Sequence, residues 1–437
     1  MKLSDLFVFC AVLVAAHADH KTLILVENYG VKETHSIFLG YLTGSGHELT
    51  YKMADDSTLT LFQFGELVYD NVIILAPSTQ DFGGDLSSAT FAEYVDSGGN
   101  VFVIADSSIG DAIRDFGYEC GIEFEESGTK VIDHLNFDFA DEGMHSRLFI
   151  DPKQVMDNKL ITGGVPVHPV LYDGIGMLLD DENELLIPVI TATSTAYSFF
   201  PADKITEHPE AVGKSTTLIT ALQARNNARV MFVGSLEMLS DKMILSPVKK
   251  AGTDKLHPSN GNAALIQSLL NWTFKKVGVL RIAEVNHHLK GEVEPPSYYT
   301  ITEDVEYKIK IEEKMDGKWV EFKNQDVQME FVRIDPFVRL AMKKEKGFYV
   351  TKFKLPDVYG VFQFKVNYKR EGYTFLSSAT QVPVRPLKHN QYERFIPVAY
   401  PYYVSAFSMM IGVLLFSFVF LHYKDPTTSA STKQKSQ

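Results

Sequence analysis

The stretch Val72-Ile-Ile-Leu75 is short, apolar at every position and rich in β-branched residues. Thr22-Leu-Ile-Leu-Val26 and Val101-Phe-Val-Ile-Ala105 share this character. Short apolar runs without polar alternation are typical of strands that are covered on both faces of a parallel sheet. These three stretches therefore predict buried strands of an α/β domain.

Helical patterns and further strands continue this organisation. Residues 91–95 have a helical pattern that ends at Ser97-Gly98-Gly99, and residues 262–276 form an amphipathic helix. Residues 218–222 and 229–233 are predicted as later strands. The alternation of strand and helix predicts a lumenal α/β domain with a largely parallel sheet over residues 19–285. A division into two subdomains near residue 150 stays open.

The pattern of polar and apolar residues changes after Pro295-Pro296. Residues 305–311 and 361–368 alternate polar and apolar side chains, and turn signals such as Asp316-Gly317 and Glu371-Gly372 separate such runs. Alternation with period two, broken by turns, is typical of antiparallel strands that are buried on one face. Residues 296–386 are therefore predicted to form an antiparallel β-sandwich of roughly immunoglobulin size.

Both ends of the chain carry apolar segments. Residues 404–421 contain no charge and are long enough to cross a bilayer, which predicts a transmembrane helix over 402–423. A juxtamembrane linker, 387–401, precedes this helix and a cytosolic tail, 424–437, follows it. Residues 1–18 have the pattern of a secretory signal peptide that is cleaved after Ala18. These features predict a single-pass type I membrane protein with its bulk in the lumen.

Composition excludes two classes of function. The formal net charge of −13 argues against nucleic acid as a partner. Cys10 leaves with the predicted signal peptide, so Cys120 is the one cysteine of the mature chain. An internal disulfide and a Cys-x-x-Cys redox function are therefore excluded.

Catalytic and ligand-binding motifs are incomplete. The run Gly213-Lys214-Ser215-Thr216 lacks the earlier glycine of a phosphate-binding loop, because position 208 is His208. Asp-x-Asp, zinc-ligand spacing and the G-x-S-x-G nucleophile elbow are also missing. We therefore predict no catalytic residue, no cofactor and no metal site.

Polar residues at the ends of the predicted strands are the remaining candidates for a binding site. Glu27, Ser78 and Asp106 follow the three strands at the edge where open parallel sheets bind ligands. They could meet a sugar or a peptide, although helix caps and turns are the simpler explanation. The glycosylation sequon at Asn271 lies within a predicted helix, and we expect it to stay mostly unmodified.

Small residues form one face of the predicted transmembrane helix. Ser405, Ser408 and Gly412 are spaced i, i+3 and i+7, and such faces let a second membrane helix approach closely. We predict a helix-packing face at these residues. Ordinary exposure to lipid is an alternative that the sequence leaves equally open.

Four stretches of the sequence are distinctive: Val26-Glu-Asn-Tyr-Gly-Val-Lys-Glu-Thr-His-Ser-Ile-Phe38, Leu59-Thr-Leu-Phe62, Val72-Ile-Ile-Leu-Ala-Pro77 and Asp81-Phe-Gly83. In these stretches the chain resembles the DDOST family of non-catalytic oligosaccharyltransferase subunits. The likeness covers the whole chain in the same order: signal, α/β domain, β domain, single span and short lysine-containing tail.

The resemblance implies a fold, a set of partners and a location in the cell. The α/β domain would be a divergent relative of amidotransferase-like domains without their catalytic site. The chain would assemble with a multi-spanning catalytic subunit, a ribophorin II-like subunit and a small DAD-type membrane subunit in the endoplasmic reticulum membrane. Lys433 and Lys435 match a Lys-x-Lys-x-x retrieval signal, which a receptor reads.

Two functions of other classes remain as alternatives. One is a single-span lumenal enzyme that acts on carbohydrate at the edge of the sheet. The other is a cargo receptor of the early secretory pathway, for which the same tail would be suitable. The lack of an evident acid–base pair counts against the enzyme.

Overall fold

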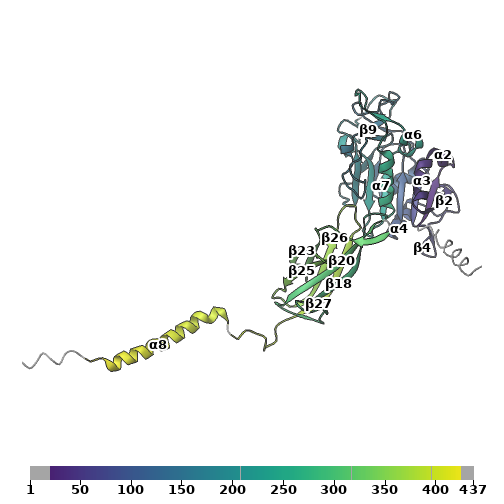
Figure 1. The fold of residues 1–437 in the computed structure, drawn as a ribbon. Coiled ribbons are helices and arrows are strands. Elements are labelled where there is room, and N and C mark those ends of the chain that lie inside the picture. Colours follow the sequence, from purple (N-terminus) through teal and green to yellow (C-terminus); the bar gives the residue numbers. More distant parts are fainter. Residues whose placement is uncertain (1–19, 207, 316, 395, 425–437) are drawn as a thin grey trace, which may run out of the picture.

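The computed structural model describes residues 20–206, 208–315, 317–394 and 396–424. Three parts follow one another along this chain: an α/β region, a β-sandwich and a long C-terminal helix (Figure 1). The predicted signal peptide with Ala18, and the tail residues Lys433 and Lys435, lie outside the described residues.

A mixed sheet of nine strands forms the centre of the α/β region. Five neighbouring strands are parallel: β2 (His47–Met53), β1 (His20–Val26), β5 (Asn71–Leu75), β6 (Asn100–Ile104) and β15 (Arg229–Val233). The other four pair antiparallel with their neighbours: β14 (Thr217–Gln223), β11 (Met177–Leu179), β7 (Ile122–Phe124) and β12 (Leu186–Thr191). The predicted strands are confirmed. Strands β14 and β15 are antiparallel because residues 224–228 are too few for a parallel crossover.

Helices cover both faces of this sheet. Leu23 and Leu25 of β1 pack against one helical layer and Ile24 against the other, so neither face of the strand meets water. The layer beside Ile24 contains α2 (Val31–Thr34), α3 (Ser36–Gly44), α6 (Asp241–Ile244) and α7 (Asn262–Thr273). The opposite layer contains α4 (Ser88–Asp96) and α5 (Asp111–Glu119).

Small hairpins and single turns complete the α/β region. The hairpin that contains β9 lies at the end of the α/β region away from the sandwich, near α6 (Figure 1). The hairpins are β3 (Phe62–Gln63) with β4 (Glu66–Leu67), β8 (Lys130–Ile132) with β13 (Tyr197–Phe199), β9 (Leu148–Ile150) with β10 (Val170–Tyr172), and β16 (Val248–Lys249) with β17 (Leu256–His257). The 3₁₀ turns are η1 (Pro152–Gln154), η2 (Gly213–Ser215) and η3 (Glu237–Leu239).

Two five-stranded sheets form the sandwich. One contains β18 (Val279–Leu289), β20 (Asp304–Met315), β21 (Lys318–Glu321), β24 (Lys343–Glu345) and β25 (Phe348–Lys354). The other contains β19 (Tyr299–Thr300), β22 (Gln328–Val332), β23 (Pro336–Ala341), β26 (Gly360–Tyr368) and β27 (Leu376–Arg385). All pairs are antiparallel except β19 with β27, and fully buried Tyr307, Phe331 and Phe364 join the two sheets.

The sandwich begins earlier in the chain than the alternation of polar and apolar residues indicates. Strand β18 pairs antiparallel with β20 over its whole length. Residues 279–285, which the sequence groups with the α/β domain, therefore belong to the first sheet of the sandwich. The pairing favours a domain limit near Val279, and the other expected limits stay predictions.

Arg229 joins the two folded parts. Its guanidinium is fully buried and donates to four backbone carbonyls, two from Nη1 and two from Nη2. The acceptors are the oxygens of Trp272 (2.6 Å), Val277 (2.9 Å), Gly278 (3.0 Å) and Gly372 (3.2 Å). Gly372 lies in the turn between β26 and β27, so a single side chain binds α7, the connecting segment and the sandwich together.

The C-terminal helix stands apart from the sandwich. Beyond Arg385 the chain reaches η4 (Pro397–Ala399) and α8 (Tyr400–His422). Within the described part of the chain, one helix is long and apolar enough to cross a membrane: Pro397–His422, 26 residues with no part buried against the protein. At about 1.5 Å per residue it measures about 39 Å, more than the hydrocarbon thickness of about 30 Å. The predicted C-terminal span therefore fits the structure.

Candidate functional site

The carboxyl edge of the parallel strands holds all three predicted strand-end residues, but it does not bring them into one site. Glu27 follows β1, and its Oε1 accepts a hydrogen bond of 2.5 Å from the backbone N–H of Ser78, which follows β5. Glu27 therefore holds two loops together. Asp106 follows β6 and lies in a separate cavity of about 340 Å³.

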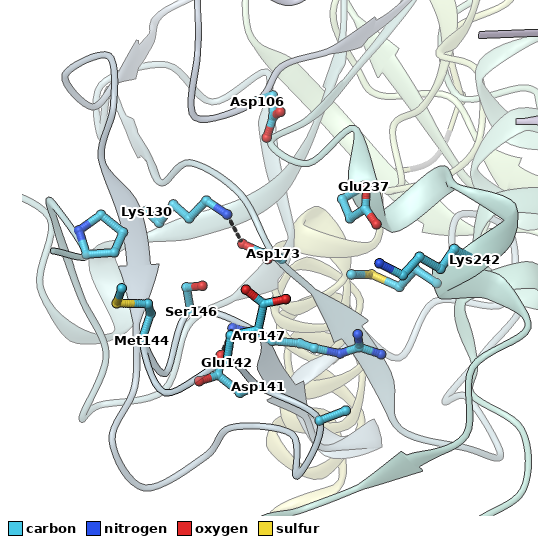
Figure 2. A pocket seen from close by; sticks show the side chains of 13 residues that line it. Asp106, Lys130, Asp141, Glu142, Met144, Ser146, Arg147, Asp173, Glu237 and Lys242 are labelled. Atoms are coloured by element: carbon cyan, nitrogen blue, oxygen red, sulfur yellow. Dashed lines mark hydrogen bonds and ion pairs between the residues drawn. The ribbon is translucent and has the colours of Figure 1, made fainter. Parts of the chain in front are cut away.

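This cavity, which we call the edge cavity, is lined mainly by charged side chains (Figure 2). The Nζ of Lys130 in β8 contacts Oδ1 of Asp173 at 2.7 Å. Glu237 of η3 and Lys242 of α6 lie across the cavity from this pair in Figure 2. Burial raises the pKa of Asp106, while the Ser107 N–H group and the charge of Lys130 oppose this change in part.

The loop that precedes β9 forms another wall of the edge cavity. Burial alone would raise the pKa of Asp141, but the backbone N–H groups of Arg147, His145 and Gly143 hold this pKa below its ordinary value. Their distances to the Asp141 carboxylate are 3.0, 2.7 and 2.8 Å. Beside it, Nε of Arg147 lies 3.0 Å from Oδ2 of the fully buried Asp138. The two interactions hold this wall of the cavity in place.

The remaining charge of the edge cavity is negative. Arg147 is paired with Asp138, and Lys130 with Asp173. The lining then still contains the acidic Asp106, Asp141, Glu142 and Glu237 against the basic Lys242. A phosphate or diphosphate group would meet repulsion here, whereas hydroxyl groups or a cation would find acceptors.

The described lining of the edge cavity lacks the histidine and cysteine that commonly activate a nucleophile. Its described lining contains neither histidine nor cysteine, and Ser146 supplies its single hydroxyl. A nucleophile needs a base within hydrogen-bond reach, and the described lining offers Ser146 no histidine for this role. In the described part of the chain, no three His, Cys, Asp or Glu side chains are grouped to hold a metal ion. The expectations of no catalytic residue, cofactor or metal stay predictions.

A histidine pair beside this cavity was not anticipated from the sequence. The Nδ1 atoms of His134 and His145 are 2.6 Å apart, and Nε2 of His134 is 2.8 Å from the Tyr197 hydroxyl. His145 also stacks on Phe137, with 4.0 Å between ring centroids. His134 is exposed, His145 is half-buried, and neither belongs to the cavity lining. Three separate segments supply these side chains, so no spacing in the sequence indicates the cluster.

The predicted packing face lies on α8. The Ser405 hydroxyl donates to the Tyr402 carbonyl and the Ser408 hydroxyl to the Ser405 carbonyl, both at 2.9 Å. Apart from its chain neighbours and the backbone of its own helix, a Cβ at Gly412 would meet no atom within 4 Å. The face is therefore smooth and open, and whether another helix covers it stays a prediction.

Two family models cover most of the chain. The model described as OST48, N-terminal domain, matches residues 13–276, and the OST48 middle domain matches residues 287–424. The chain belongs to the OST48 family. The OST48 middle-domain match begins within β18, and the described residues of this match end just after α8.

Curated OST48 relatives have nearly the same length. A Danio rerio protein is 52% identical over 427 residues, which are 97% of both chains. A Drosophila melanogaster protein is 50% identical over 97% of both chains, and a Caenorhabditis elegans protein is 49% identical over 93% of this chain and 92% of its own. All three are named dolichyl-diphosphooligosaccharide–protein glycosyltransferase 48 kDa subunit. The resemblance found in the sequence is confirmed.

Solved structures add little for this OST48 chain. A putative ThuA-like protein from Parabacteroides merdae aligns with 58% of this chain and 89% of its own, at 14% identity and a TM-score of 0.28. A likeness this low carries no argument about fold or chemistry. The affiliation of the α/β domain with amidotransferase-like domains therefore stays a prediction.

Proposed function

We propose that this chain is a structural, non-catalytic subunit of the oligosaccharyltransferase of the endoplasmic reticulum. That complex transfers a preassembled glycan from dolichyl diphosphate to the asparagine of Asn-x-Ser/Thr in nascent proteins. The observation that carries the proposal is the 52% identity, over 97% of both chains, to a relative named as the 48 kDa subunit of this transferase. Identity at this level over the whole length makes a shared assembly the simplest explanation.

The chemistry of the edge cavity supports an accessory role. Its negative lining disfavours the diphosphate of the glycan donor, and its Ser146 hydroxyl has no histidine in the described lining to act as a base. The chemical step would then belong to a multi-spanning catalytic partner. A ribophorin II-like subunit and a small DAD-type membrane subunit complete the proposed set of partners.

The proposed location is the endoplasmic reticulum membrane. Helix α8 would cross the bilayer, and the α/β region and the sandwich would lie in the lumen. Lys433 and Lys435 would return escaped protein through a cytosolic receptor. Removal of the signal peptide after Ala18 is part of the same proposal.

Substitutions at the strand ends test the non-catalytic assignment. Glu27→Gln, Ser78→Ala and Asp106→Asn would be introduced separately, and glycosylation of an acceptor peptide would be divided by the amount of assembled complex. Loss of a catalytic group lowers the rate by powers of ten, whereas a structural change lowers the amount of complex. We expect normal activity per assembled complex. Complex that assembles in normal amount but is inactive would refute the assignment.

Isolation of the chain from microsomes in digitonin tests membership in the complex. We expect a fixed set of partners that includes a multi-spanning subunit, whatever proteins the cell secretes. A cargo receptor would instead recover clients that change with the secreted proteins, and that result would replace our proposal.

A further inference from the structure

The end of the sandwich that faces away from the α/β region exposes a cluster of apolar side chains, which we call the distal patch. Its members lie in loops or at strand ends, where the described chain covers them only in part. Their exposed fractions are Val293 78%, Tyr298 47%, Ile334 83%, Phe337 45%, Tyr359 64% and Val361 52%. Single exposed apolar residues are ordinary, but a cluster at one end of a domain marks an interaction surface.

Backbone pairing and side-chain contacts place these loops together. Nη1 of Arg333 donates to the Tyr359 carbonyl at 3.1 Å, which joins the loop between β22 and β23 to the start of β26. The Arg385 guanidinium lies 4.8 Å from the centre of the Tyr298 ring. Val361 is paired with Pro383 near the end of β27. The distal patch therefore surrounds the point where the chain leaves the sandwich.

The exit point connects the distal patch to the membrane helix. Fifteen steps separate Arg385 from Tyr400, where α8 begins, and at about 3.4 Å each they reach at most about 50 Å. The opposite end of the sandwich is joined to the α/β region through Gly278 and Gly372. The chain thus leaves the sandwich for α8 from the distal end, away from the α/β region (Figure 1).

We propose that the distal patch rests in the lumenal headgroup layer of the membrane that α8 crosses. Tyrosine and phenylalanine favour this layer, and Arg333 and Arg385 can direct their charges toward lipid phosphates. Acidic Glu292, Glu294 and Asp335 lie in the same loops and keep the contact shallow, because a carboxylate resists transfer into hydrocarbon. The linker supplies an effective concentration on the order of mM, so weak affinity for lipid is sufficient.

The outer surface of the sandwich differs in character from the distal patch. On β20, Lys308 is paired with Glu306 and Lys310 with Glu312, each at 3.0 Å. Such a surface is suited to water and not to lipid. The proposal rests on α8 crossing the bilayer and does not require that the chain be part of the oligosaccharyltransferase complex.

Fluorescence quenching by lipid tests the proposal on the full chain. Ile334→Cys would be labelled with an environment-sensitive dye, and the chain reconstituted alone in phosphatidylcholine nanodiscs that contain headgroup-level spin-labelled lipid. Native Cys120 should react slowly, because burial raises its pKa to about 12. Val320→Cys is the matched control: Val320 is 41% exposed on β21, at the opposite end of the sandwich. Tyr359→Cys provides a second position within the patch.

We expect blue-shifted emission and quenching by lipid for dyes at positions 334 and 359, and neither effect at 320. Equal, water-like emission at all three positions would overturn the proposal. A dye at 334 that is shielded from aqueous iodide only in the assembled complex, without quenching by lipid, would also overturn it and assign the patch to a protein partner. Because the nanodisc experiment uses the chain alone, its failure would leave the proposed membership in the complex unaffected.

Discussion

His47 is a buried histidine that the fold holds in its neutral form. It begins β2, its Nδ1 lies 2.9 Å from the Thr22 hydroxyl, and its ring packs against Phe274. Burial, followed by the charges of Lys276 and His20, lowers its pKa from 6.5 to about 4. Between these two pH values the unfolded chain binds a proton that the folded chain does not. Stability is therefore lost as the pH falls from 6.5 toward 4.

The variant His47→Asn should remove this pH dependence. Asparagine keeps an acceptor near the Thr22 hydroxyl but does not titrate. Between pH 7 and pH 4 the unfolding free energy of the variant should fall by about 3 kcal/mol less than that of the native chain. Urea unfolding of the full chain in detergent, followed by tryptophan fluorescence, would measure the difference. The exposed His389 provides the control His389→Asn, and identical pH profiles for native and His47→Asn would contradict the assignment.

Arg229 is a buried cation that forms no ion pair with a carboxylate of the described residues, and its charge is met by four carbonyls. Burial lowers its pKa to about 9. Lysine at this position would present three donors from one atom and would leave carbonyls of the joint unpaired. We expect Arg229→Lys to cost about 3 kcal/mol or more, and thermal unfolding together with proteolysis near Val277 would measure the loss.

The control for Arg229 is an exposed arginine of the sandwich. Arg281 is 47% exposed and contacts Glu312 at 2.7 Å. Exposed ion pairs contribute up to about 1 kcal/mol, so Arg281→Lys should change stability little. Equal effects of the two substitutions would mean that the joint does not depend on the guanidinium geometry.

Among the elements, α7 shows how a local signal and a long-range contact define one helix end. The helical pattern continues to residue 276, but α7 ends at Thr273. Lys275 has a φ of 55°, and its N–H and that of Lys276 bond the Trp272 and Asn271 carbonyls in a Schellman arrangement. A lysine occupies the position that usually favours glycine. Arg229, which binds the same Trp272 carbonyl, adds a tertiary reason for the helix to stop here.

The element α8 carries the prediction about assembly. A Cβ at Gly412 meets no atom within 4 Å apart from its chain neighbours and its own helix backbone, so a leucine there should not strain the helix, and it favours insertion into the bilayer. If the small face of Ser405, Ser408 and Gly412 packs on a partner, the larger side chain will separate the two backbones and weaken their dispersion contacts. Gly412→Leu should then reduce recovery of the other subunits in digitonin, with topology unchanged.

Two further variants of α8 control this result. Gly412→Ala should be tolerated, because a methyl group still permits close approach. Val413→Leu lies one residue further around the helix, on an exposed side, and should have little effect. If Gly412→Leu recovers partners as well as the native chain does, lipid covers the face and the lumenal domains carry assembly.

At the scale of the whole molecule, the location of the protein in the cell is predicted to depend on its tail and on its assembly with partners. A reporter that carries residues 402–437 should reach the cell surface when Lys433→Ser and Lys435→Ser are combined, because the retrieval receptor no longer binds. Surface immunofluorescence would measure this change. In the full chain the effect should be weaker, since retained partners also hold it. A reporter that stays inside the cell would contradict the retrieval signal.

The sequence by itself determined the features that depend on local composition. Apolar runs such as 72–75 marked the buried strands, alternation marked the sandwich, and the uncharged stretch 404–421 marked the membrane helix. The stretches 26–38, 59–62, 72–77 and 81–83 also identified the family. These signals can be read locally because burial on one face, on two faces or in lipid imposes a distinct spacing of apolar residues.

Only the tertiary structure decided which distant residues meet. Glu27 binds Ser78, 51 positions away, while Asp106 at the neighbouring strand end lies apart in the edge cavity. Strand β18 joined the sandwich because it pairs with β20, although its own sequence alternates weakly. Arg229 binds Gly372 across 143 positions. Such partners follow from sheet order and loop packing, whose free energy is shared among many contacts, so no local pattern in the chain encodes them.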